Sequence, residues 1–144
     1  MSASRATRAT RIAELRERAV REAQAALAES ARAVAAARAA VAEVERSWSA
    51  QADRIGRCTS PTGLAEASAY LDTLRRRADQ AQQNVTACQA VEVRMREKVQ
   101  RARMEQRKIE LWRDGIVESL SEEEARRERV ASDELAARMR ERAP

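Results

Sequence analysis

Apolar residues recur at every seventh position through two long stretches of this chain, and this period limits the fold more than any other feature. One row of the repeat in the first stretch consists of Ala13, Val20, Leu27, Val34, Val41, Trp48 and Ile55. The second stretch has one row of Ala67, Leu74, Ala81, Cys88, Met95, Ala102, Ile109 and Ile116, interleaved with Leu64, Leu71, Ala78, Val85, Val99 and Leu120. An apolar repeat that averages 3.5 residues over about seven heptads is typical of a coiled coil. The pattern therefore predicts two long helices that pack along narrow seams.

One interruption separates the two stretches. The segment 56–63 contains two of the three glycines and one of the two prolines, and Ser60 before Pro61 is typical of an N-cap followed by the first helical position. The expected elements are a first helix over 4–55, a loop over 56–63, a second helix over 64–120, and a stretch over 121–142 that continues or restarts the helix. The predicted fold is all-α: one domain over 1–144, a long antiparallel two-helix coiled-coil hairpin with a C-terminal helical overhang.

The loop allows a register in which the numbers of facing residues add up to 122. Trp48 then faces Leu74, and large side chains repeatedly face small ones. The polar seam positions also coincide, because Ser30 meets Glu92 and Arg16 meets Gln106. Polar layers that satisfy each other fix the register of a coiled coil. We therefore expect this register, not one shifted by a heptad.

In the same register the start of the first helix lies beside residues 116–118 or so, which leaves the chain from Ser119 onward without an intramolecular partner. Ser121 and Glu124 have the spacing of a capping box, which predicts a break or a fresh helix start there. The tail has few apolar residues, and a helix of this kind is marginal alone. We expect it to become ordered on a partner surface.

The residues of common active sites are missing. The chain has no His, no Cys pair at metal-ligand spacing and no glycine-rich phosphate loop, so the sequence predicts no catalytic residue, no cofactor and no metal. Cys58 and Cys88 lie too far apart along a hairpin to bridge, which favours reduced thiols in the cytosol. No stretch of about 18 apolar residues exists, so no membrane span is expected.

Residues 75–108 form a basic band, with ten Lys or Arg against four Asp or Glu. No aromatic residue interleaves with the run Arg75 to Arg77, as a stacking platform for bases would need. A solvated helix face is the favoured interpretation, and no nucleic-acid partner is expected.

Two local strings add a family resemblance. Tyr70-Leu71-Asp72-Thr73-Leu74, just after the loop, and the terminal run from Asp133 to Arg142 resemble motifs of the small stalk proteins of bacterial type III export. These are the flagellar FliJ family and its virulence counterparts of the SctO or YscO type. The two long helices of unequal length are also similar to that family.

The resemblance implies a stalk without an active site that couples the hexameric export ATPase to the export gate, at the cytoplasmic face of the inner-membrane secretion apparatus. It also implies contact with export chaperones. Residues matched to gate-facing positions are Tyr70 and Leu74, and those matched to the terminal motif near the ATPase are Asp133, Glu134, Leu135, Ala136 and Arg138. Leu74 also lies on the seam, where core packing is the favoured role. The Ala- and Arg-rich composition favours a virulence system over a flagellar one.

Two other functions stay open at this point. The chain could be a self-associating structural coiled coil, in which two hairpins pair and the tail exchanges between copies, or a basic helical nucleic-acid binder. A stalk should be monomeric alone, a bundle should be a dimer, and the affinity of a phosphate binder should fall steeply with salt.

Overall fold

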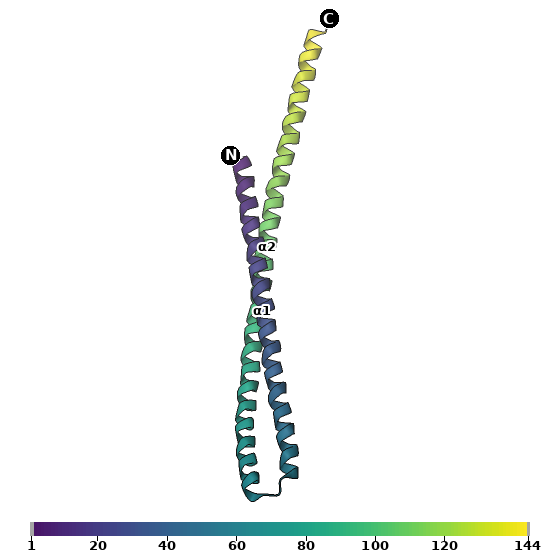
Figure 1. The fold of residues 1–144 in the computed structure, drawn as a ribbon. Helices are drawn as coiled ribbons and strands as arrows, with labels where there is room; N and C mark the ends of the chain where they lie inside the picture. Colours follow the sequence, from purple (N-terminus) through teal and green to yellow (C-terminus); the bar gives the residue numbers. More distant parts are fainter. Residues whose placement is uncertain (1, 144) are drawn as a thin grey trace. The chain divides into compact units, whose positions relative to one another are not determined.

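The computed structural model describes residues 2–143 and contains two helices there, α1 (Ser2–Arg57) and α2 (Pro61–Arg142), joined by one short loop (Figure 1). The predicted all-α class is confirmed. Both helices extend further than expected, and α2 runs without a break through Ser121. The capping-box spacing of Ser121 and Glu124 therefore starts no helix. The prediction that the whole chain acts as one domain stays a prediction.

Local hydrogen bonds explain why the loop is shorter than predicted. The Gly63 N–H donates to Ser60 Oγ over 3.3 Å, as expected for an N-cap, and the Leu64 N–H donates to the Ser60 carbonyl over 3.0 Å. Across the loop, the Cys58 thiol donates to the same carbonyl over 3.6 Å. A Cβ on residue 63 would lie 2.8 Å from Cys58 Sγ, so glycine lets the loop close tightly.

The chain forms two compact units. One of them, the hairpin unit, spans Glu22–Gln100. It is a helical hairpin that contains the loop and the parts of α1 and α2 on either side of it (Figure 1). Its core is a line of small and medium apolar side chains. The buried apolar residues are Val34, Ala37, Leu74, Val85 and Val99.

The predicted register agrees with a contact in this unit. Arg75, the neighbour of Leu74, lies over the ring of Trp48, with its Cζ 5.8 Å from the ring centroid. A register shifted by one heptad would place Ala81, not Leu74, opposite Trp48. Ala37 and Val85, which face each other in the predicted register, are both buried.

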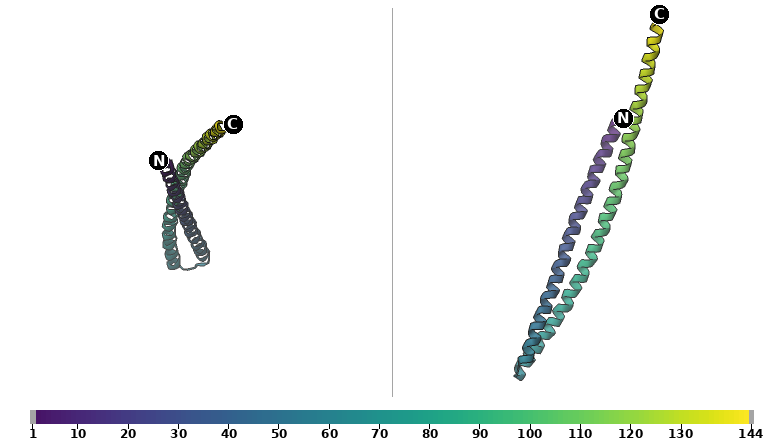
Figure 2. Two further views of the ribbon diagram at one scale, coloured as in Figure 1. Left: turned by 90° about the horizontal axis from the view of Figure 1, so that it is seen from above. Right: turned by 90° about the vertical axis from the view of Figure 1, so that its right-hand side faces the viewer.

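The other unit combines residues 2–21 of α1 with residues 101–143 of α2. Ala9, Ala13 and Val20 are buried in it. Here α2 continues well past the start of α1 (Figure 2). From residue 124 to 143 every side chain is exposed except Ala136, which is half-buried. The predicted overhang is therefore present as a helix without an intramolecular partner.

Both predicted seam patterns hold at nearly every position. All members of the rows given above are buried or half-buried except Leu64, which is exposed. Leu64 lies in the first turn of α2, where the seam has barely begun. The heptad rows were otherwise correct.

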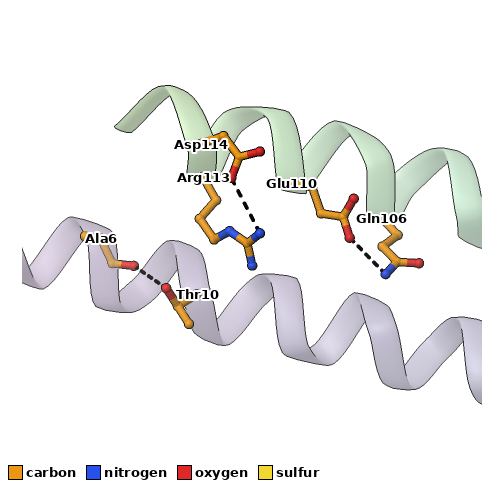
Figure 3. A network of polar contacts seen from close by, with 6 residues as sticks. All are labelled: Ala6, Thr10, Gln106, Glu110, Arg113 and Asp114. Carbon is orange, nitrogen blue, oxygen red and sulfur yellow. Dashed lines mark hydrogen bonds and ion pairs between the residues drawn. The ribbon is translucent and has the colours of Figure 1, made fainter. Parts of the chain in front are cut away.

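The polar layers behave differently from the prediction. Ser30 Oγ donates to the Leu27 carbonyl over 2.7 Å, and Glu92 pairs with Arg96 of its own helix. Gln106 Nε2 donates to Glu110 Oε1 over 3.1 Å (Figure 3). Arg16 is exposed. Partners three or four residues away on the same helix are always within reach, so they satisfy these groups without a bond across the seam. The expected mutual pairing was wrong.

Candidate partner-binding surfaces

Exposed large apolar side chains on α2 gather mainly at three places. The group beside the loop is Leu64 and Tyr70, the middle group is Met104, Leu111, Trp112 and Val117, and the overhang group is Val130, Leu135 and Met139. All three groups lie on α2, and Leu64 is their one member that belongs to the seam rows given above. Within residues 2–143, no cluster of three or more His, Cys, Asp or Glu side chains could hold a metal ion. Neither helix, over the same residues, has a segment long and apolar enough to cross a membrane.

Tyr70 lies at the loop end of the hairpin unit. Its side chain is 42% exposed and borders an open hollow that also touches Gln51 and Arg54 of α1 and Cys58 of the loop. Because the seam does not cover this ring, truncating it removes little packing. Tyr70 is therefore placed where a partner could reach it.

Leu74, one helical turn further on, is in the opposite situation. It is 1% exposed and is the most completely buried large side chain described. Its neighbour Arg75 covers Trp48, which is half-buried on α1. This burial supports the core-packing role that the seam predicts for Leu74. A direct contact with a partner would require the hairpin end to open.

The terminal motif lies on the exposed overhang in the other unit. Asp133, Glu134, Leu135 and Arg138 are exposed, Leu135 by 60%, and Ala136 is half-buried. Leu135 and Met139 are four residues apart and so share one face of α2. The overhang also carries an ion pair between Glu123 and Arg127 at 2.8 Å. Leu135 and Met139 are therefore flanked along α2 by charged residues of both signs.

The middle group was missed by the sequence analysis. Leu111 and Trp112 lie between the seam positions Ile109 and Ile116, off both heptad rows. They line a hollow of about 430 Å³ together with Arg5 of α1. The available signal was a tryptophan outside the repeat in a chain with only two.

The structure does not bring all predicted site residues together. Tyr70 and Leu74 belong to the hairpin unit, and the terminal motif belongs to the other unit. Each set is a separate candidate surface.

Comparison with known families gives one result. The sequence matches the family model described as flagellar FliJ protein over residues 6–144. Neither the curated proteins nor the solved structures gave a significant match.

Proposed function

Because the chain belongs to the flagellar FliJ family, we propose that it is a non-catalytic stalk that joins the export ATPase hexamer to the export gate. Membership places it with flagellar and type III export proteins. The finer assignment depends on one observation: α2 continues to Arg142 as a helix whose last twenty or so residues have no partner within the chain.

The overhang is suited to enter a partner. A helix that buries no side chain within its own chain lacks the packing that stabilises most helices in proteins. Its exposed Leu135 and Met139 form a short apolar stripe, with Arg138 beside it and Asp133 and Glu134 just before it. A surface that covers the stripe and pairs these charges would stabilise the helix and gain affinity at the same time. We assign this surface to the central part of the ATPase hexamer.

The loop end is the proposed contact with the export gate. Tyr70 is an aromatic residue with 42% of its surface exposed, and aromatic residues often dominate binding energy at interfaces. Leu74 contributes to this contact indirectly. It is buried in the seam one helical turn from Tyr70, where it helps to hold the two helices together. Export chaperones are further proposed partners, and the proposed location is the cytoplasmic face of the secretion apparatus. We propose that the protein alone is monomeric. That the chain serves a virulence secretion system and not a flagellar one stays a prediction.

The experiment that tests the ATPase contact uses two leucines with the same exposure. Leu135 on the overhang and Leu15 on α1 are both 60% exposed, so aspartate at either position costs little folding energy. We expect Leu135→Asp to weaken binding to the purified export ATPase by about tenfold or more, because it places a charge where an apolar contact forms. Leu15→Asp should bind like the unmodified chain. Equal effects of the two substitutions would remove the assignment of the overhang.

A further inference from the structure

The start of α1 and the part of α2 beside it carry opposite charges. Residues 110–124 of α2, the acidic stretch, contain six Asp or Glu against one Arg. Both parts belong to the same compact unit, and α1 at Thr10 lies alongside α2 at Glu110 (Figure 3). Residues 2–12 of α1 contain no Asp or Glu and three arginines, which are Arg5, Arg8 and Arg11.

Each of these charge patterns is unfavourable for its own helix. A helix N-terminus already carries about half a positive charge, so three arginines without a carboxylate disfavour the start of α1. In α2, Glu110, Asp114 and Glu118 follow one another at intervals of four residues, and like charges at this spacing destabilise a helix. Packing the two stretches side by side brings charges of opposite sign together. The contact between α1 and α2 therefore compensates for both local costs.

The attraction between the two stretches does not depend on fixed ion pairs. Arg113 pairs with Asp114 of its own helix over 3.5 Å, and the ion pairs described over residues 2–143 leave the three arginines of α1 out. The axes of packed helices lie about 8–10 Å apart. Exposed charges attract each other over about 10 Å at 0.1 M salt and over about 30 Å at 0.01 M. The two stretches are therefore close enough to attract each other as a whole.

The apolar contact under the start of α1 is thin. Over residues 4–12, Ala9 is buried, and Ala6 and Ile12 are half-buried. The buried residues of α2 all lie in the hairpin unit. Little apolar surface holds the start of α1 in place, so the charges contribute a large share of its attachment. The seam residues of α2 in this region are only half-buried, and they are Ile109, Ile116 and Leu120.

We infer that residues 2–12 of α1 form a detachable strap, which charge attraction to the acidic stretch holds against α2. Release of the strap exposes the α2 seam from Ile109 to Leu120, about three helical turns. These turns lead into the overhang, so the strap sets how much of α2 is open to a partner. The inference does not depend on which protein that partner is.

Charge reversal separates this attraction from the helix preference of α1 itself. The strap variant is the full chain with Arg5→Glu, Arg8→Glu and Arg11→Glu. Glutamates near a helix N-terminus favour the helix, so local preference alone predicts slower amide hydrogen exchange over residues 2–12. Loss of the attraction predicts the opposite result. At low ionic strength we expect exchange over residues 2–12 to become faster by about three- to tenfold, as for three lost charge pairs of ordinary surface strength.

A second variant reverses the acidic side and provides the rescue. It carries Glu110→Lys, Asp114→Lys and Glu118→Lys, and alone it should also speed exchange over residues 2–12. Combined with the strap variant, it restores opposite charges and should return exchange to the rate of the unmodified chain. Emission of the uncharged apolar dye Nile red should rise with the strap variant, because the α2 seam is exposed, and should fall again in the combined variant.

A matched control reverses the same number of charges in the hairpin unit. Its substitutions, at exposed arginines of α1, are Arg32→Glu, Arg38→Glu and Arg54→Glu. These arginines do not lie beside the acidic stretch, so exchange over residues 2–12 should stay unchanged. Circular dichroism should show all variants to be helical.

Three results would overturn the inference. The first is unchanged or slower exchange over residues 2–12 in the strap variant, which would show that charge attraction does not hold this segment. The second is failure of the combined variant to regain slow exchange. The third is faster exchange over the whole of α1 in the strap variant, including its part in the hairpin unit, because this would indicate general unfolding and not release of a strap.

Discussion

Arg75 of α2 covers the indole ring of Trp48 of α1, with the guanidinium carbon 5.8 Å from the ring centroid. This contact joins the two helices near the loop. A cation over a partly exposed aromatic ring stabilises a fold by about 0.5–1 kcal/mol. A double-mutant cycle between Arg75→Ala and Trp48→Leu, measured by denaturant unfolding, should give a coupling energy of that size. Arg76→Ala, one residue along, should show no coupling with Trp48→Leu; equal coupling for both arginines would rule out the specific contact.

Tyr70 and Leu74 should separate binding from folding. Leu74→Ala should lower the free energy of unfolding by about 2–5 kcal/mol, toward the lower value near the end of a hairpin, because it empties a fully buried seam position. Tyr70→Ala should leave thermal unfolding nearly unchanged and weaken engagement of the export gate. Thermal melts and secretion assays on the two variants check this. Normal secretion by the Tyr70→Ala variant would remove the case for a gate contact at that residue.

Two serines that the sequence offers as N-caps, Ser60 and Ser121, should respond differently to alanine. Ser60→Ala should cost about 1 kcal/mol, since Ser60 Oγ accepts the Gly63 N–H at the start of α2. Ser121→Ala should be neutral or stabilising by up to about 0.5 kcal/mol, because Ser121 is exposed inside a continuous helix and alanine is the better helix former. Urea unfolding of both variants measures the difference. A loss of about 1 kcal/mol at Ser121 would indicate that it caps a helix in solution.

Two glycines offer a similar comparison. Gly115→Ala should raise the free energy of unfolding by about 0.5–1 kcal/mol, because the helix interior has open space for a methyl group. Gly63→Ala should gain less or destabilise, since its Cβ would force Cys58 Sγ to move. In a Cys58→Ala background that penalty should shrink. An unchanged effect of Gly63→Ala in that background would show that the thiol contact is not the cause.

The seam could be predicted from the sequence because its physical basis is periodic. A residue on a heptad row faces the neighbouring helix whatever its chemistry, so Cys88 and Ala102 were placed as well as Leu74 was. The exposed overhang followed from the same arithmetic, since α1 is shorter than α2. The fold class and the position of the terminal motif therefore needed no structure.

Local choices among hydrogen-bond partners could not be predicted in this way. Ser30 and Gln106 each bond within their own helix, and Ser121 continues α2 instead of capping a new one. Which partner each side chain bonds depends on small free-energy differences between nearby groups. A heptad repeat carries no information about these differences. The hollow at Gly115 was missed for another reason: Leu111, Trp112 and Gly115 lie between the seam rows, where the heptad pattern carries no information.

The central claim is that the overhang binds the export ATPase, and deletion of residues 121–144 tests it most directly. The removed segment contributes almost no buried side chain, so the shortened chain should stay helical, monomeric and close to its original melting temperature. Binding to the purified ATPase, measured by pull-down and titration, should be lost. Retained ATPase binding by the shortened chain would contradict the account, and loss of a dimer that the full chain forms would instead support a self-associating coiled coil.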